Sequence, residues 1–307
     1  MRELSHMVTA AESGRTVKSL ALKALRLSQG QFSSLKFQGG IWVDGAPARA
    51  NERLREGQVL SARLQDAGQK IAPAAIPISI PWQDGDYLIA EKPAPLPTLP
   101  SCHQAGPTLE NALYAALGCP ADFVFRPVNR LDKGTSGLMA VALNAHAQQL
   151  LQRQLHSPGF IREYLAVCEG HPPQESGVID APIGLAGEGV RRAVRPDGKP
   201  AVTRYRLVAQ TAERSVLRLQ LETGRTHQIR VHLRHLGCPI VGDYLYGREC
   251  PALPGRFALH ACFLAFDHPL TGQRVALESP LPEALAALMR PVQLEKDAQD
   301  TFIQSFI

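Results

Sequence analysis

Residues 126–143 read RPVNRLDKGTSGLMAVAL, a polar loop that runs directly into an apolar segment. Asp132 lies between Arg130 and Lys133 in this loop. An aspartate is ionised at neutral pH in water, and neighbouring positive charges favour its charged form even where water is excluded. Such a carboxylate suits a nucleophile better than a general acid. The alternative is a turn residue whose side chain accepts hydrogen bonds from its own loop.

The segments around this loop predict a sheet with a few helices. Short apolar runs predict strands at 87–90, 138–143, 164–168, 202–209 and 216–221, and helical patterns cover 108–117 and 145–156. Strands and helices do not alternate as in a βαβ chain, and no GxGxxG motif is present. We therefore expect an α+β domain around a mostly antiparallel or mixed β-sheet. Residues 184–200 are rich in Gly and Arg, and the turn at 196–198 predicts the tip of a basic hairpin or loop.

The first 66 residues have a pattern of their own. Thr16 is expected to cap a helix that Ser28-Gln-Gly30 breaks, and a shorter helix then ends at Gly39-Gly40. The apolar face of the first helix would hold Val17, Leu20, Ala24 and Leu27. Asp44-Gly45 predicts a hairpin turn, and a strand follows at 59–64. These signals predict a small α+β unit.

The chain is thus expected to have four parts. They are the small unit 1–66, an Ala-, Pro- and Gly-rich linker 67–81, the main domain 82–290 and a tail 291–307.

Positive charge is concentrated at the start of the chain. Residues 1–70 hold 11 Lys and Arg against 6 Asp and Glu, whereas the remaining residues hold 22 of each kind, so the whole net charge of +5 lies in the first quarter. A concentrated positive field suits a module that binds a polyanion, because neutralising phosphates releases counterions. A solvated basic surface without a partner is the alternative.

Composition narrows the class of protein. The chain is 45% hydrophobic and 20% charged, which excludes collagen-like and wholly disordered chains. No apolar run approaches the length of a membrane-spanning helix, and residues 1–14 lack the apolar core of a secretory signal. The six cysteines form no CxxC pair, so we expect reduced thiols and a cytoplasmic protein with no membrane partner.

Five ordered segments resemble one enzyme family. Arg130-Leu-Asp132 followed by Thr135-Ser-Gly137 resembles the catalytic motif of the RluA-type RNA pseudouridine synthases. The other four segments are similar to that family in the same order: Glu91-Lys-Pro93; Arg162-Glu-Tyr164-Leu-Ala-Val; Thr223-Gly-Arg225-Thr-His-Gln-Ile-Arg-Val-His232 with Pro239-Ile-Val-Gly-Asp243; and Ala258-Leu-His260-Ala with His268-Pro. The resemblance implies the pseudouridine synthase-like fold and an enzyme that isomerises uridines in RNA. Such an isomerisation requires no redox cofactor, nucleotide or metal.

The resemblance also implies roles for individual residues. The family's catalytic aspartate falls on Asp132, its base-contacting tyrosine on Tyr164, and the arginine that pairs with the carboxylate on Arg225. An aromatic ring with a hydroxyl suits a stacking platform for a flipped pyrimidine, and the phenol could also accept the C5 proton. The resemblance also implies that Arg130 helps to fill the gap left by the flipped nucleotide. Sequence alone leaves open whether Asp132 attacks C1′ of the ribose or C6 of the base.

The segment after Arg225 predicts a helix with a basic face. Thr226 could cap it, and its apolar face would end at Gly237. Arg230 and Arg234 are four residues apart and would share a face suited to phosphates, although a plain solvated face fits equally well. We also place Arg162 among the residues expected to bind substrate.

Residues 25–60, LRLSQGQFSSLKFQGGIWVDGAPARANERLREGQVL, resemble an S4-like RNA-binding domain. This resemblance implies that the first 66 residues dock structured RNA, with Lys18, Arg26 and Lys36 as expected contacts. Large-subunit ribosomal RNA is the expected target, with transfer RNA as the alternative, and we expect a monomer.

Two departures and three alternatives remain. Asn129 stands where the family usually has His, and Pro95 where it usually has Gly, which leaves the choice of substrate open. His227, His232, His235 and His260 lack the HExxH spacing, so we expect no metal site.

The alternatives to a ribosomal RNA pseudouridine synthase are a transfer RNA synthase, a non-catalytic RNA-binding or ribosome-assembly factor on the same fold, and another RNA-modifying enzyme such as a methyltransferase.

Overall fold

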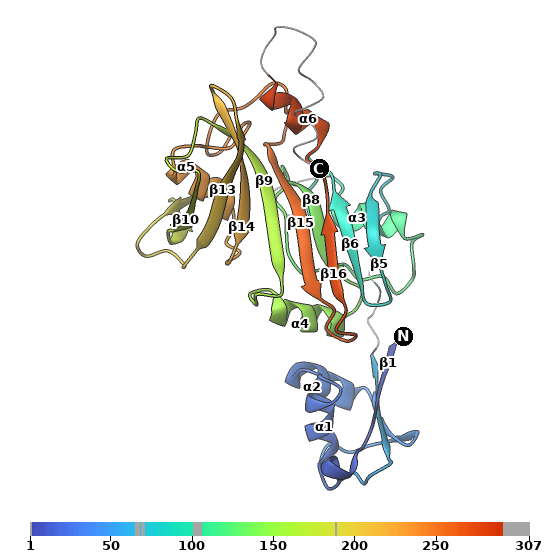
Figure 1. Cartoon of the computed structure of the whole chain (residues 1–307). Coiled ribbons are helices and arrows are strands. Elements are labelled where there is room, and N and C mark those ends of the chain that lie inside the picture. Colours follow the sequence, from blue (N-terminus) through green and yellow to red (C-terminus); the bar gives the residue numbers. More distant parts are fainter. Residues whose placement is uncertain (1, 65–67, 69–70, 101–105, 188, 291–307) are drawn as a thin grey trace.

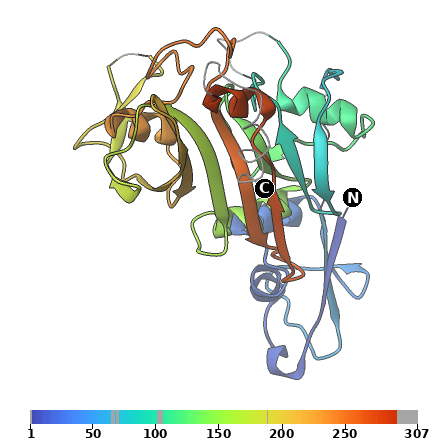
Figure 2. The same cartoon turned by 45° about the horizontal axis from the view of Figure 1, so that its top comes forward.

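The computed structural model describes residues 2–64, 68, 71–100, 106–187 and 189–290. A small N-terminal unit lies at one end of a large twisted sheet (Figures 1 and 2). The tail expected at 291–307 lies outside the described residues. Within the described residues, no helix is both long and apolar enough to cross a membrane.

The N-terminal unit packs two helices and a short 3-10 turn against a four-stranded sheet with strand order β1-β4-β2-β3. Its elements are β1 (Arg2–Met7), η1 (Ala10–Glu12), α1 (Val17–Lys23), α2 (Gln29–Phe37), β2 (Ile41–Val43), β3 (Ala46–Pro47) and β4 (Val59–Leu64). Asp44 and Gly45 both have positive φ angles, 49° and 81°, which confirms the predicted hairpin turn. Strand β1 is not predicted from the sequence; it pairs antiparallel with β4 along its whole length.

The boundary between the two helices differs from the prediction. The Thr16 side chain caps α1 as predicted, but α1 ends at Lys23, before Leu27. Ser28 does not break a helix; it begins one. Its Oγ accepts from the Gln31 amide at 3.1 Å, and the Gln31 side chain accepts from the Ser28 amide at 3.0 Å. This reciprocal capping starts α2 and places Gly30 inside a helix.

The large sheet has the strand order β10-β13-β14-β9-β15-β8-β6-β5, with β16 beside β15 and β7 beside β8. All its pairings are antiparallel except that of β8 with β15, so the predicted α+β fold with a mixed sheet is confirmed. Its strands are β5 (Ser79–Gln83), β6 (Tyr87–Lys92), β7 (Arg126–Pro127), β8 (Ser136–Ala142), β9 (Ile161–Glu169), β10 (Ser176–Asp180), β13 (Val202–Gln210), β14 (Arg214–Leu221), β15 (Leu259–Asp267) and β16 (Arg274–Glu278). The helices of this region are α3 (Leu109–Ala116), α4 (Ala145–Gln154), α5 (Gln228–His235), α6 (Glu283–Ala286) and the 3-10 turn η2 (Ala287–Met289).

Strand β8 is buried on both faces, which explains its uninterrupted apolar sequence. Met139 and Val141 belong to the same apolar cluster as the buried face of α3. Leu138 and Ala140 point the other way and join the cluster that contains the buried residues of α4. A Cβ atom on Gly137 would lie 2.3 Å from the Ala261 carbonyl oxygen, so only glycine lets β8 leave the Asp132 loop so close to β15.

Two expected boundaries shift. Strand β5 begins at Ser79, inside the stretch expected as a linker, and pairs with β6. Isoleucines 76, 78 and 80 alternate with other residues there and pack against the main core, a signal that the neighbouring prolines obscured. The Gly- and Arg-rich segment forms the hairpin β11 (Ile183–Leu185) and β12 (Arg192–Val194), and the predicted turn at 196–198 follows β12 rather than forming the hairpin tip.

Candidate active site

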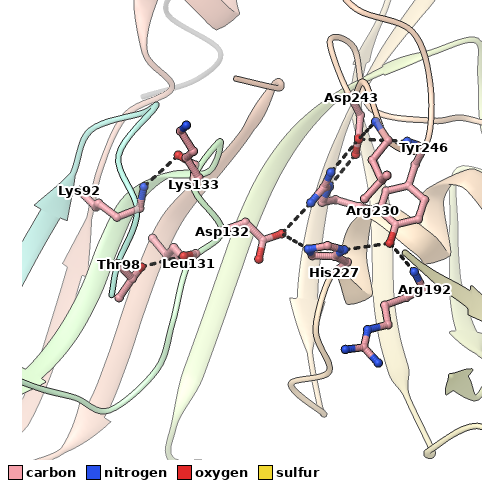
Figure 3. A network of polar contacts seen from close by, with 11 residues as sticks. Lys92, Thr98, Leu131, Asp132, Lys133, Arg192, His227, Arg230, Asp243 and Tyr246 are labelled. Atoms are coloured by element: carbon pink, nitrogen blue, oxygen red, sulfur yellow. Dashed lines mark hydrogen bonds and ion pairs between the residues drawn. The ribbon is translucent and has the colours of Figure 1, made fainter. Parts of the chain in front are cut away.

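Asp132 lies on the loop that connects β7 to β8 (Figure 3). The backbone of this loop is held on both sides. The Thr98 hydroxyl donates to the Leu131 carbonyl at 2.7 Å, and the Leu96 amide donates to the Lys133 carbonyl at 3.0 Å. The Asp132 side chain remains 31% exposed and lines a cavity of about 760 Å³. A rigid loop therefore presents an accessible carboxylate to an open cavity.

Arg230, in the first turn of α5, is the cationic partner of Asp132. Its Nη1 lies 3.2 Å from Asp132 Oδ2, while its Nε and Nη2 donate to the two oxygens of Asp243 at 2.7 and 2.8 Å (Figure 3). Burial acts to lower the pKa of Arg230, but its hydrogen bonds and the charges of Asp243 and Asp132 raise the pKa above the usual value. The guanidinium is thus a fixed positive charge beside the carboxylate.

The sequence-based choice of Arg225 for this pairing is wrong in the structure. Arg225 precedes α5, and its Nε donates to the Pro200 carbonyl at 2.9 Å, although the residue lines the same cavity as Asp132. Thr226 does not cap the helix either, because His227 occupies the N-cap position in a left-handed conformation, with φ 60°. The helix therefore starts at Gln228 and turns Arg230, five residues after Arg225, toward Asp132.

The same geometry corrects the predicted phosphate contact at Arg230. Its side chain is only 3% exposed and is occupied by two carboxylates. Arg234, one turn later, is exposed and donates to the Tyr246 carbonyl. The two arginines therefore do not form one exposed basic face.

Tyr164 lies on β9 in the wall of the cavity, beside Asp132. The residue is 4% exposed, and burial raises the pKa of its phenol. The phenol is therefore neutral at physiological pH. This placement favours the predicted role as a stacking platform over that of a phenolate ready to accept a proton.

The other two predicted substrate-binding arginines of the main domain also line the cavity. Arg130 is exposed at its rim. Arg162 lies on β9 and is 5% exposed; its Nη2 donates to the Leu155 carbonyl at 3.4 Å, while its Nε has no hydrogen-bond partner among the described residues. Both arginines thus lie in the wall of the cavity that Asp132 lines.

Lys92 is a site residue to which the sequence analysis gave no role. It is fully buried, and its Nζ donates to the carbonyls of Leu96 at 2.7 Å, Pro93 at 3.0 Å and Lys133 at 3.4 Å. Burial lowers its pKa to about 7, against the opposing effect of the Asp132 charge and with a further lowering by Arg256. Lys92 thus ties the 93–96 segment to the Asp132 loop, and its place in the Glu91-Lys-Pro93 segment was the available signal.

The two departures from the family pattern both support this loop. The Asn129 side chain is buried, and its Oδ1 accepts from the Ala140 amide of β8 at 3.0 Å. Pro95 precedes Leu96, which bonds to the Lys133 carbonyl, and it follows a cis peptide bond. Both residues therefore lie in segments that hold the Asp132 loop in place.

The predicted contacts of the N-terminal unit lie on its surface. Lys18 and Lys36 are exposed, and Phe37, beside Lys36, is 88% exposed. Arg26 has φ 54° and donates to the Pro269 carbonyl of the large domain at 2.7 Å, while its own carbonyl accepts from Gln149 at 3.3 Å. The structure therefore gives Arg26 a contact between the two units.

Three of the four histidines considered as metal ligands have protein partners. His232 contacts Thr203 and Ala181, and His260 contacts Ser136 and Ser279. Burial lowers the pKa of both, to about 4 for His260. His227 lies 4.0 Å from Asp132 and belongs to the candidate site itself.

Known proteins resemble this chain over the region that contains Asp132, Tyr164 and Arg230. A family model described as RNA pseudouridylate synthase matches residues 86–235. An uncharacterized RNA pseudouridine synthase of Bacillus subtilis is 36% identical over 292 residues, which cover 92% of this chain and 96% of that protein. The ribosomal large subunit pseudouridine synthase D of Xanthomonas campestris is 38% identical over 278 residues, covering 85% and 84%. The solved structure of human RNA pseudouridylate synthase domain containing 1 has a TM-score of 0.57 at 26% identity, covering 77% of this chain and 97% of that one.

Proposed function

The chain belongs to the RNA pseudouridine synthases, which are isomerases, and has an RluA-type catalytic domain; from this premise we propose that Asp132 is its nucleophile and large-subunit ribosomal RNA its substrate. The observation that carries the first part is the pairing of a partly exposed Asp132 with a buried Arg230. The buried guanidinium places a fixed positive charge 3.2 Å from the carboxylate, in a cavity that a base would fill.

The chemistry that the site would perform is a detachment and reattachment of uracil. The target nucleotide leaves its stack at a cost of about a few kcal/mol and enters the cavity beside Tyr164. Asp132 bonds to C1′ of the ribose or to C6 of the base, the bond between C1′ and N1 breaks, and the uracil turns and bonds to C1′ through C5. The C5 proton is lost and N1 gains a proton, so the product is an isomer of the substrate. Departure of the carboxylate restores the enzyme.

The large-subunit target rests on the relatives. The protein of Xanthomonas campestris carries that substrate in its name, and the similarity extends over 85% of this chain. Transfer RNA is the competing substrate, and the experiment below distinguishes the two.

The N-terminal unit is proposed to act as the S4-like RNA-docking module. Its two helices expose Lys18 and Lys36, and the unit holds most of the charge excess of the chain. Arg26 of this unit contacts Pro269 of the catalytic domain, so that one RNA could touch both.

Pseudouridine mapping in cells tests the function. Total RNA from a strain lacking the gene is compared with RNA from strains restored with wild type, Asp132→Asn or Asp180→Asn. Asp180 is an exposed aspartate on β10 and serves as the matched control. We expect one or more large-subunit positions to lose pseudouridine on deletion, to recover it with wild type and Asp180→Asn, and to remain unmodified with Asp132→Asn.

Two outcomes would contradict the proposal separately. Full modification by Asp132→Asn would remove Asp132 from the nucleophile role. Loss of pseudouridine only from transfer RNA would leave that role intact and overturn the proposed substrate. Binding of purified Asp132→Asn to RNA with near-normal affinity would show that the loss is chemical.

A further inference from the structure

His227 stands between Asp132 and Tyr246 at the edge of the cavity (Figure 3). Its Nε2 lies 4.0 Å from Asp132 Oδ2, and its Nδ1 lies 2.8 Å from the Tyr246 hydroxyl. The residue has a left-handed backbone, with φ 60°, a conformation that is strained for a residue other than glycine. The surrounding structure therefore holds this imidazole in one place.

The hydrogen bonds of Tyr246 determine where its phenolic proton points. Tyr246 is 1% exposed, and burial raises the pKa of its phenol, so the hydroxyl is protonated at neutral pH. The hydroxyl oxygen accepts from the Arg192 amide of β12 at 2.8 Å. Among the described residues, the remaining hydrogen-bond partner of this hydroxyl is His227 Nδ1. The phenolic proton therefore points at Nδ1, which must be the acceptor.

This arrangement fixes the tautomer of His227. Burial has the largest effect and lowers the pKa of His227. The negative charges of Asp132 and Asp243 oppose this effect, and the positive charges of Arg230 and Arg192 add to it. The ring is therefore neutral at physiological pH. A neutral imidazole that accepts at Nδ1 carries its proton on Nε2. Nε2 makes no hydrogen bond to any described residue and its ring lines the cavity in front of Asp132.

We propose that His227 is a catalytic hydrogen-bond donor, whose Nε2–H binds the uracil oxygen on which negative charge develops when Asp132 attacks. This inference rests on the proposed nucleophile. If Asp132 bonds to C1′, the electron pair of the C1′–N1 bond leaves with uracil and spreads onto its carbonyl oxygens. If Asp132 adds to C6, the C5–C6 electrons move toward O4. A neutral donor stabilises either anion without transferring its own proton.

In this scheme Tyr246 is a positioning residue. Its hydroxyl connects His227 to the backbone of β12, and its ring lies 4.9 Å from the Arg230 guanidinium. Phenylalanine at 246 would keep the ring and remove the hydroxyl. His227 would then lose the group that selects its tautomer.

Nitrogen-15 NMR of the histidine rings in the full-length protein tests the tautomer directly. Long-range spectra distinguish protonated from unprotonated ring nitrogens, and the His227 signals are assigned by their absence in His227→Gln. We expect the Nε2–H form in wild type at pH 7.5 and a mixture of tautomers in Tyr246→Phe. An Nδ1–H form or a doubly protonated ring in wild type would overturn the inference, and neither result depends on Asp132.

Single-turnover kinetics test the catalytic role. The amide nitrogen of glutamine can replace the Nε2–H donor, whereas leucine cannot, and both variants bear the same backbone strain. We expect His227→Leu to lower the rate constant about 100-fold, the typical effect of one lost oxyanion donor. The rate constant of His227→Gln should fall by at most about tenfold. Equal rates in the two variants would overturn the donor role. Thermal unfolding of both variants checks that they fold; if His227→Leu does not, Tyr246→Phe must slow the reaction at unchanged KM, and an unaltered rate would contradict the inference.

Active Asp132→Asn would instead refute the proposed nucleophile while leaving the tautomer measurement intact. The failures of the two proposals are therefore distinguishable.

Discussion

Arg230 Nη1 lies 3.2 Å from Asp132 Oδ2. The other two nitrogens of the guanidinium, Nε and Nη2, are paired with a second carboxylate. That other carboxylate, Asp243, is fully buried and also accepts from the amides of Leu245 and Tyr246. The guanidinium is therefore aimed by a fixed anion before any RNA arrives. Preorganised charge of this kind stabilises a reacting group without reorganisation during the reaction.

Removing Arg230 is expected to harm both stability and activity. Arg230→Met would leave Asp243 buried without a counter-charge, and breaking a buried pair in this way costs about 3–5 kcal/mol. Urea unfolding measures this loss. The double variant Arg230→Met/Asp243→Leu should recover much of the stability, because no unpaired charge remains, yet form no pseudouridine. A double variant with near wild-type activity would show that the pair serves the fold alone.

Arg225 is expected to behave differently, although sequence reasoning gave it the ion pair. It is partly exposed, and its Nε bonds to the Pro200 carbonyl. Arg225→Gln should leave the free energy of unfolding within about 0.5 kcal/mol, as for most surface changes. Its activity loss should be smaller than that of Arg230→Gln, measured under the same single-turnover conditions. The reverse order would mean that the two arginines exchange roles when RNA binds.

Lys92 predicts a specific pH dependence of stability. Its pKa is about 7 in the folded chain against an ordinary value of 10.5. Between these values the unfolded chain binds the proton and the folded chain does not, so rising pH favours folding. The buried ammonium therefore lowers the free energy of unfolding by its full amount below pH 7, and this loss is relieved as the pH rises toward 10.5.

Comparison with Lys92→Met isolates this contribution. Other titrating groups are common to both proteins and cancel. The difference in free energy of unfolding, wild type minus variant, should rise by about 2 kcal/mol from pH 7 to pH 9. Urea unfolding at pH 6, 7, 8 and 9 provides the values. Parallel curves for the two proteins would show that Lys92 keeps its ordinary pKa.

Local features of the fold were predictable because they depend on neighbouring residues. The Asp132 loop and strand β8 follow from a polar Gly-, Thr- and Ser-rich turn that precedes an apolar run. The hairpin at Asp44-Gly45 follows from a dipeptide that tolerates positive φ. Ser28 shows the limit of such reasoning, because the same residue type signals both a break and a helix start.

The site itself depends on distant contacts that no local pattern contains. The choice between Arg225 and Arg230 depends on where α5 begins, which the left-handed His227 determines. Asp243 lies 13 residues from Arg230, and the Lys92 ammonium contacts a carbonyl 41 residues away. Burial of Lys92 also follows only from the packed sheet, because lysine in a sequence is most simply read as a surface residue.

The proposed RNA-docking role of the N-terminal unit predicts a smaller salt dependence when its exposed lysines are removed. Each phosphate contact contributes a slope of about −0.7 to −0.9 to a plot of log affinity against log salt concentration. Lys18→Gln/Lys36→Gln should therefore reduce the magnitude of the slope by about 1.4–1.8, measured by binding of ribosomal RNA fragments between low and moderate salt. Arg206→Gln removes an exposed charge on β13, outside this unit, and serves as the control. A lysine variant whose slope equals that of wild type would show that these basic helices do not contact RNA phosphates.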